Sequence, residues 1–185
     1  IAAFGGDAPT LSGQDLPEGL TSASEEVLSV TGLTKKFSGL VALDDAKIFV
    51  QRGKISGLIG PNGSGKSTMV NCITGVTKAD SVVINLGPLQ IHNEHTWQRA
   101  RAGLGRTFQN IRLFRNLTVL DNVVVACISA GESVKSADKS ALALLNQVGV
   151  LHHAYRFAGE LSFGDQRRVE IARALGTEPE LLLLD

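Results

Sequence analysis

The chain has 185 residues, of which 43% are hydrophobic, and its 18 basic and 18 acidic side chains leave it without net charge. This length suits one domain with a packed core, and the balanced charge argues against general nucleic-acid binding, which needs a positive field. Two cysteines, Cys72 and Cys127, make no disulfide framework and indicate a reducing compartment, and no run reaches the roughly 18 apolar residues of a membrane-spanning helix.

The chain begins with a segment that has no hydrophobic period. Residues 1–25 mix Gly, Pro, Ser, Thr and Asp, and we expect them to form a flexible lead-in or linker. The only methionine is Met69, and residues 181–185 have the pattern of a strand that stops at its tip. We therefore expect the chain to be a fragment of a longer protein, cut at both ends.

Strands and one helix are predicted in the first half. Residues 27–30 and 41–50 are rich in β-branched and aliphatic side chains, which predicts two strands. Residues 55–59 are apolar with little alternation, which predicts a short strand covered on both faces. A helix is predicted over 66–74, with Gly75 at the position that follows its C-terminal cap.

The second half alternates helices with short extended pieces, which predicts an α/β fold. Thr118 and Asp121 have the spacing of a capping box, so a helix is predicted from there to residue 130. The other predicted elements are a hairpin over 82–91 around Gly87 and Pro88, a polar helix over 94–101, an extended piece over 104–109, helices over 140–148 and 165–175 that end at Gly149 and Gly176, and a buried strand over 181–184.

Residues 60–68 read GPNGSGKST and fit the phosphate-binding pattern G-x-x-x-x-G-K-[S/T]. Glycines free to take positive φ let main-chain N–H groups surround phosphate oxygens, and the following helix directs its dipole at the same anion. Lys66 supplies positive charge for the β- and γ-phosphates, and the Ser67 hydroxyl suits Mg²⁺. The loop therefore predicts a nucleoside triphosphate site. Residues 77–80, TKAD, match the guanine-reading pattern of GTPases but follow Lys66 too closely, so we interpret them as a surface turn.

Residues 161–175 read LSFGDQRRVEIARAL and resemble the signature segment of ABC (ATP-binding cassette) ATPases, L-S-G-G-Q followed by a helix. The phosphate loop lies upstream and an apolar strand ending in Asp185 lies downstream, as in that family, and the resemblance covers about residues 26–185. It implies an α/β P-loop NTPase with a RecA-like core, an antiparallel β subdomain and a helical signature subdomain at about 112–172, truncated at the Walker B strand.

Two further blocks, residues 106–114 and 116–123, resemble the ATPases of bacterial branched-chain amino acid importers. The resemblance implies a motor subunit that hydrolyses ATP with Mg²⁺, peripheral on the cytoplasmic face of the plasma membrane. Its partners would be a second cassette in a head-to-tail homo- or heterodimer, membrane permease subunits and, indirectly, a periplasmic substrate-binding protein, but no nucleic acid.

Two alternatives stay open at this point. One is a soluble ABC ATPase that acts on ribosomes or DNA, and the other is an exporter cassette of the lipopolysaccharide type. The stretch between Gln109 and Leu161 has only about fifty residues and lacks sustained heptads, so it holds no coiled-coil insertion, which favours a transporter.

The resemblance also implies roles for individual residues. Phe37 would stack on adenine, Gln109 would be the Q-loop glutamine that touches Mg²⁺ or the attacking water, and Asp185 would be the Walker B aspartate that holds Mg²⁺ through water. Lys66, Gln109 and Asp185 are thus the expected catalytic residues, and Ser67 joins the last two at the metal. The expected ATP contacts are Phe37, Gly60, Pro61, Asn62, Gly63, Ser64, Gly65, Lys66, Ser67 and Thr68.

Ser162, Phe163, Gly164 and Asp165 would cap the γ-phosphate of ATP bound to the second cassette. Phe163 replaces a glycine and Asp165 a glutamine of the common signature, and a carboxylate is unfavourable beside a triphosphate unless it accepts from ribose hydroxyls. The family's catalytic glutamate and switch histidine would both lie beyond residue 185. We therefore expect the intact protein to hydrolyse ATP and a 185-residue fragment to bind nucleotide poorly without turning it over.

Overall fold

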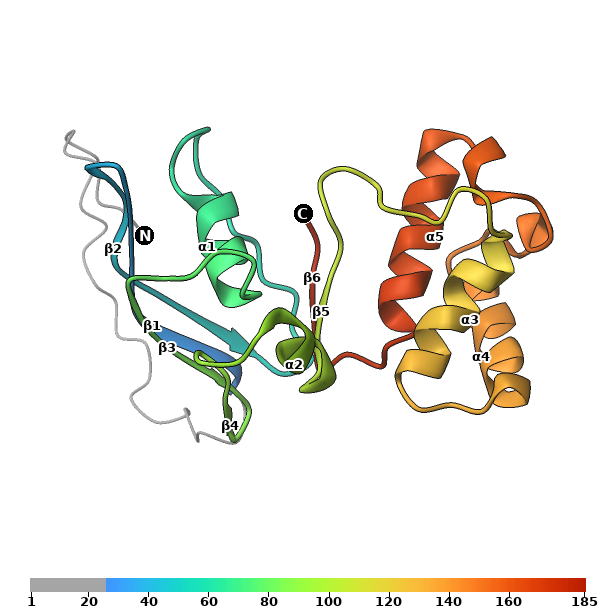
Figure 1. The fold of residues 1–185 in the computed structure, drawn as a ribbon, viewed down its shortest axis with the longest axis horizontal. Coiled ribbons are helices and arrows are strands. Elements are labelled where there is room, and N and C mark those ends of the chain that lie inside the picture. The colour runs from blue at the N-terminus through green and yellow to red at the C-terminus, as the bar shows by residue number, and fades with distance from the viewer. Residues whose placement is uncertain (1–25) are drawn as a thin grey trace, which may run out of the picture. The chain divides into compact units, whose positions relative to one another are not determined.

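The structure is a computed structural model that describes residues 26–185, so the predicted lead-in at 1–25 lies outside the described residues. The chain divides into two compact units, residues 1–94 and residues 95–185. Figure 1 labels the helices and strands of both units.

The first unit is built on a four-stranded antiparallel sheet with strand order β2-β1-β3-β4. Val30, at the centre of β1, pairs with Ile48 on one side and with Ile84 on the other, and both Val30 and Ile84 are fully buried. The two strands predicted first are confirmed but are longer than expected, and the predicted hairpin is also confirmed. The strands are β1 (Glu26–Phe37), β2 (Leu40–Gln51), β3 (Ser81–Leu86) and β4 (Leu89–Gln90).

A two-residue turn joins β1 to β2. Ser38 and Gly39 take φ values of 43° and 90°, and positive φ at both central residues is what the primed hairpin turns require. The turn fixes Phe37 opposite Leu40 at the end of the ladder. Phe37 is therefore the last residue of β1, next to the tip of the hairpin.

The predicted strand over residues 55–59 is wrong. The segment has no regular structure, and Ile55 and Ile59 are almost fully exposed. A buried strand forms only where neighbours accept and donate the hydrogen bonds of its main chain. None of the six strands among residues 26–185 pairs with this segment. Its apolar sequence is therefore not sufficient to make it a strand.

The predicted helix that follows the glycine-rich loop is confirmed. Helix α1 (Lys66–Ile73) ends at Thr74, and Gly75 takes a positive φ of 77° as expected for a residue just past a helix. The helix buries Met69, Cys72 and Ile73 and contacts β1 and β2, beside which it lies in Figure 1. The sheet thus holds α1 by its apolar face and leaves its first turn uncovered.

The second unit combines a small parallel sheet with a helical cluster. Strands β5 (Leu104–Arg106) and β6 (Leu181–Leu183) pair in parallel. The strand predicted at 181–184 is confirmed, but its expected burial is wrong: its residues are half-buried and Leu184 is 62% exposed, because β5 alone pairs with it among the described strands. The helices are α2 (Thr96–Arg101), α3 (Val119–Ser129), α4 (Val134–Gln147) and α5 (Phe163–Leu175), with single 3-10 turns at Leu151–His153 and Ala158–Glu160.

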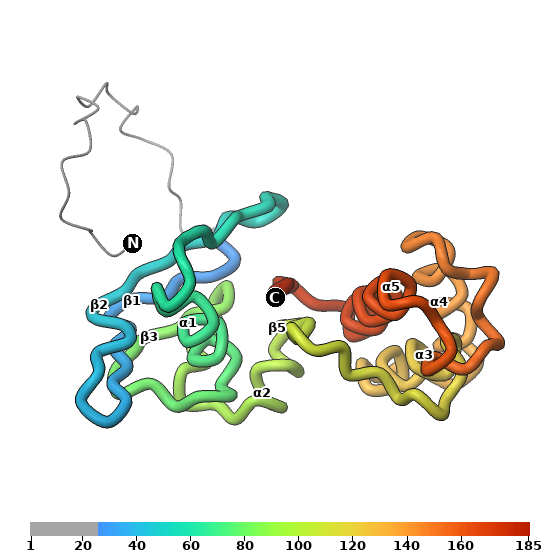
Figure 2. Tube along the Cα trace, turned by 90° about the horizontal axis from the view of Figure 1, so that it is seen from above, coloured from blue at the N-terminus to red at the C-terminus, as the bar shows by residue number. Residues whose placement is uncertain are grey.

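Helices α3, α4 and α5 share one apolar core, and Figure 2 shows them gathered together. Fully buried residues from each helix meet there, among them Val123, Leu145 and Val169. The capping box predicted at Thr118 is confirmed: the Asp121 N–H donates to the Thr118 hydroxyl at 3.0 Å. No helix among residues 26–185 combines the length and the apolar character needed to cross a bilayer.

Several helix boundaries differ from the prediction: α2 begins at Thr96 and not at residue 94, and α5 begins at Phe163 and not at residue 165. Helix α4 begins at Val134 and not at residue 140, because the Ser133 hydroxyl accepts the Ser136 N–H and caps an additional turn. Helix α5 ends at Leu175 as predicted, but Gly176 keeps a helical φ of −62°. A Cβ atom on Gly176 would lie 3.1 Å from the Cys127 sulfur, so the glycine permits close packing of α5 on α3.

Candidate functional site

The loop before α1 owes its shape to its glycines. Gly63 and Gly65 take φ values of 83° and 89°, which glycine adopts without strain. A Cβ atom on Gly65 would lie 2.8 Å from both the carbonyl oxygen of Ala42 and the Cδ2 atom of Leu43. Gly65 is therefore fixed both by its backbone angle and by contact with β2. As the N-cap of α1, it leaves the first N–H groups of the helix without intrahelical partners.

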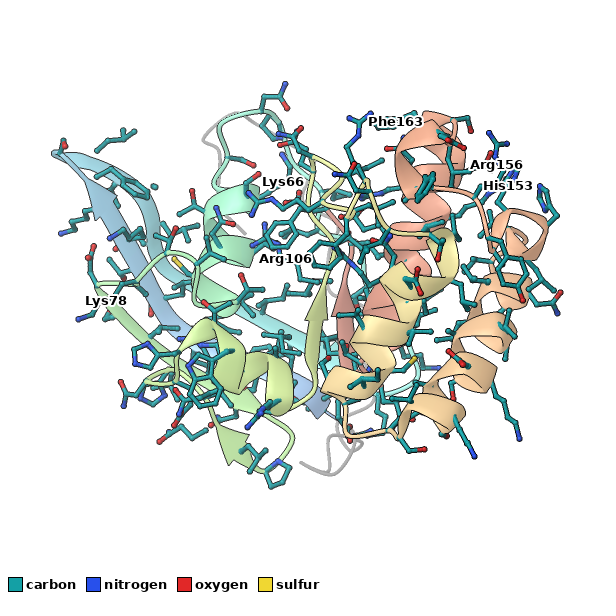
Figure 3. All side chains as sticks on the ribbon, turned by 45° about the vertical axis from the view of Figure 1, so that its right-hand side comes forward. Lys66, Lys78, Arg106, His153, Arg156 and Phe163 are labelled. Atoms are coloured by element: carbon teal, nitrogen blue, oxygen red, sulfur yellow. The ribbon has the colours of Figure 1, made fainter. Side chains whose placement is uncertain are left out.

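Lys66 begins α1, and its side chain turns back onto the loop. Its ammonium group donates to the carbonyl oxygens of Gly60 and Pro61, both at 2.7 Å, and Figure 3 shows the side chain at the loop end of the helix. An ammonium group has three hydrogens, so a third remains for a phosphate oxygen. Ser67, which follows Lys66 in α1, is exposed.

The loop, the helix N-terminus and the ammonium group together form an anion site. Helix N-termini attract anions through their unpaired N–H groups and their dipole, and Lys66 adds a full positive charge. This combination suits a chain of phosphates. Of the predicted ATP contacts, residues 60–65 form this loop and residues 66–68 form the first turn of α1.

Phe37 lies at the end of β1 with 45% of its surface exposed. The Lys35 ammonium lies 5.1 Å from the centroid of its ring. The Asp80 carboxylate accepts the Lys36 N–H at 2.6 Å and the Lys35 ammonium at 3.3 Å. The Lys36 N–H, aided by Lys35, holds the pKa of Asp80 below its usual range.

Asp80 therefore stabilises the position of the end of β1, where Phe37 lies. Sequence reasoning treated residues 77–80 as a surface turn and missed this role. Asp80 and Lys36 are 44 positions apart, and no spacing in the sequence reveals such a contact.

Asp185 lies just past the end of β6, separated from Leu183 by Leu184. Its N–H donates to the Thr107 hydroxyl at 3.2 Å, and its carboxylate lies 3.0 Å from the Arg106 guanidinium. Gln109 follows two residues after Thr107 and is exposed. The structure thus brings the predicted aspartate next to the segment that leads into the predicted glutamine. Sequence reasoning did not identify Arg106 or Thr107 as its partners.

The signature residues form the first turn of α5. The Ser162 hydroxyl accepts the Asp165 N–H at 3.2 Å and lies 2.8 Å from the Asp165 carboxylate, to which it donates. Arg168 at 3.4 Å and His153 at 3.7 Å flank the same carboxylate. The contact of Asp165 that the sequence left open is therefore a cap on its own helix. Figure 3 shows Phe163 at this end of α5, where it is 73% exposed.

The side chains that could bind a metal ion are separate oxygen ligands. Among residues 26–185, no three His, Cys, Asp or Glu side chains cluster as a protein cage for a metal ion. Mg²⁺ prefers hydroxyl, amide and carboxylate oxygens and is commonly held by one or two protein groups together with substrate phosphates. Ser67 in the first unit, and Gln109 and Asp185 in the second, offer such oxygens.

Comparison with known proteins agrees with this geometry. The pattern of the family described as "ABC transporter" matches residues 43–185. The high-affinity branched-chain amino acid transport ATP-binding protein LivG of Salmonella typhimurium is 40% identical over 177 residues, which cover 88% of this chain and 69% of LivG. BraF of Pseudomonas aeruginosa, which has the same description, is 37% identical with the same coverage.

Solved structures give the same result. The ADP conformation of MJ1267, an ATP-binding cassette of an ABC transporter, is 35% identical with a TM-score of 0.74 and covers 85% of this chain and 67% of its own. A nucleotide-free cassette matches with a TM-score of 0.75 at 35% identity, over 86% of this chain and 68% of its own. The chain therefore belongs to the ABC transporter family and has the P-loop NTPase fold of its ATP-binding cassettes.

Proposed function

We propose that the chain is the ATP-hydrolysing motor subunit of a bacterial importer for branched-chain amino acids. The observation that carries the ATP part is the loop before α1, where left-handed Gly63 and Gly65 and the Lys66 ammonium surround a helix N-terminus. The likeness to LivG and BraF, whose names specify branched-chain amino acid transport, supports the substrate class.

ATP binds with its phosphates on the loop and its base on Phe37. Main-chain N–H groups of residues 62–68 and the Lys66 ammonium neutralise the β- and γ-phosphates. The exposed ring of Phe37 offers a stacking face, and such stacking contributes about 1–3 kcal/mol per base. Lys35 lies against this ring, and Asp80 holds the strand end in position.

Hydrolysis proceeds by in-line attack of water on the γ-phosphate, a reaction governed by positioning and charge neutralisation. Mg²⁺ would supply further neutralisation of the phosphates, and Ser67, Gln109 and Asp185 are the residues that would hold it. The Gln109 amide orients the attacking water. The Arg106 guanidinium lies 3.0 Å from the Asp185 carboxylate and holds it in place.

A second cassette completes the ATP site through its signature segment. A Cβ atom on Gly164 would meet no atom of residues 26–185 within 4 Å apart from the backbone of its own helix turn, and its φ is not positive. The chain's own fold therefore gives no reason for a glycine here, whereas close approach by another molecule does. Ser162 and Gly164 at the N-terminus of α5 suit the γ-phosphate of a head-to-tail partner. The Arg168 guanidinium offsets the charge of Asp165, and His153 lies 3.7 Å from the same carboxylate.

The permease binds at the helical cluster. A hollow of about 500 Å³ is lined by Arg115, Asn116, Phe157, Gly159 and Glu160. The Phe157 ring is about half exposed there, so the hollow offers both apolar and charged contacts. A cassette bound to permease subunits in this way is peripheral on the cytoplasmic face of the membrane, and it meets the periplasmic binding protein only through the permease.

The test uses the full-length protein and a Lys66→Ala variant. We expect the wild type to release phosphate from Mg-ATP and to support uptake of leucine, isoleucine and valine when expressed with its permease, and the variant to do neither. ATP hydrolysis without uptake of these amino acids would refute the substrate class. Co-sedimentation with ribosomes instead of membranes would refute the transport role.

A further inference from the structure

A buried carboxylate lies in α5, outside every role assigned above. Glu170 is only 1% exposed, and both of its carboxylate oxygens are engaged. One oxygen accepts the Phe108 N–H at 3.2 Å, and the other accepts from the Arg167 guanidinium at 2.7 Å. Glu170 thus links the signature helix to the residue that precedes Gln109.

Arg167, one turn before Glu170 in α5, completes the same link. Its guanidinium also donates to the carbonyl oxygen of Phe108 at 2.7 Å and to the main-chain carbonyl of Asp185. Positions three residues apart lie on one face of a helix, so Arg167 and Glu170 face Phe108 together. Both main-chain polar groups of Phe108 are therefore bonded to α5.

The ring of Phe108 is held as well. The guanidinium carbons of Arg106 and Arg112 lie 4.9 and 4.5 Å from its centroid. These cation–π contacts fix the side chain, while α5 fixes the main chain. Phe108, the residue before Gln109, therefore has little freedom to move relative to α5.

Stability alone does not explain this ion pair, in which the Glu170 side chain is buried and the Arg167 side chain is 28% exposed. Removing a charge from water is costly, and apolar side chains of similar volume are often as stable or more stable. An apolar pair cannot, however, form directional hydrogen bonds with the N–H and C=O groups of Phe108. What Glu170 and Arg167 provide is a defined position for this segment.

We propose that Glu170 and Arg167 are positioning residues that place the Gln109 segment and the signature turn at Ser162 as one body. The proposal rests on the proposed function, since it matters for hydrolysis only if Gln109 and Ser162 act on ATP. In this arrangement, Gln109 of a cassette moves together with the signature turn at Ser162 of the same cassette, which contacts the ATP bound to the second cassette. Loss of the link impairs hydrolysis without loss of nucleotide binding, because the Lys66 loop makes none of these contacts.

The decisive variant is the double substitution Arg167→Met and Glu170→Met in the full-length protein. It removes both charges together, so neither is left unpaired in the interior. Glu170→Gln is the milder companion, because its amide oxygen still accepts the Phe108 N–H but its charge is lost. Asp138→Asn, which changes an exposed carboxylate on α4 of the same helical cluster, is the matched control.

Three quantities are measured: the affinity for ATP, the rate of phosphate release, and hydrogen exchange in peptides that span residues 106–112. For the double variant we expect unchanged ATP affinity, faster exchange in this segment and a hydrolysis rate lowered by about 100-fold, the effect that a misplacement of 1 Å produces. Glu170→Gln shows a smaller change in the same direction, and Asp138→Asn matches the wild type.

Wild-type exchange in the double variant would overturn the proposal, as would wild-type hydrolysis despite faster exchange. If the double variant fails to fold, the exchange and hydrolysis rates of Glu170→Gln decide in the same way. A wild-type protein that does not hydrolyse ATP would refute the proposed function instead, and the exchange rates would still show whether α5 holds residues 106–112.

Discussion

The conformation of the phosphate loop depends on Gly65, and its replacement by alanine has a calculable cost. At a φ of 89° an alanine incurs the left-handed penalty of about 1–2 kcal/mol. Its Cβ atom would also lie 2.8 Å from the Ala42 carbonyl oxygen and the Leu43 side chain. Overpacking of this kind costs about 1–3 kcal/mol more. The expected loss in the free energy of unfolding is therefore about 2–5 kcal/mol.

Gly63→Ala is the matched control, because Gly63 has a similar φ of 83° but, within the described part of the chain, an added Cβ would lie within 4 Å only of its two chain neighbours. It should lose only the backbone term of about 1–2 kcal/mol. Urea unfolding of both variants gives the difference directly, and ATP affinity should fall more for Gly65→Ala. Equal destabilisation of the two variants would refute the role of the contact with β2.

Three further predictions concern residues outside the loop. Asp80→Asn should raise hydrogen exchange at Lys36 and weaken ATP binding. Because the pKa of Asp80 is lowered on folding, the stabilising effect of its charge is complete above the ordinary value of 3.8 and lost as pH falls through the folded pKa, so wild type and variant should converge in acid-unfolding titrations. Burial, with help from Glu132, raises the pKa of Cys127 to about 11, so iodoacetamide at pH 8 should label this thiol only after unfolding; labelling of the folded protein would contradict its burial. Gly176→Ala should cost about 1–3 kcal/mol in thermal unfolding with unchanged ATP affinity, and a neutral result would show that α3 and α5 are not tightly packed.

The parts of the fold that depend on neighbouring residues in the sequence were predictable. The capping box at Thr118 and the helix that begins at Lys66 rest on bonds that close within a few residues. The resemblance to ABC ATPases likewise led to the correct family from short motifs. The start of α4 was missed although its signal, the Ser133 cap, is equally local.

The parts that depend on distant residues were not predictable. The apolar run at 55–59 reads as a strand, yet a strand also needs partners, and no local pattern reveals whether they are present. Asp80 contacts Lys36 and Glu170 contacts Phe108 across 44 and 62 positions. From the sequence alone, these two carboxylates look like ordinary surface or helix residues. The structure shows that they hold the segments that carry Phe37 and Gln109.

The central claim is that main-chain amides and Lys66 hold a triphosphate at the start of α1. Hydrogen exchange of peptides covering residues 60–68 in the full-length protein, with and without Mg-ATP, tests it most directly. The account predicts strong ATP-dependent protection of these amides in the wild type and little in Lys66→Ala. Unchanged exchange in the wild type at saturating ATP, or equal protection in the variant, would contradict it.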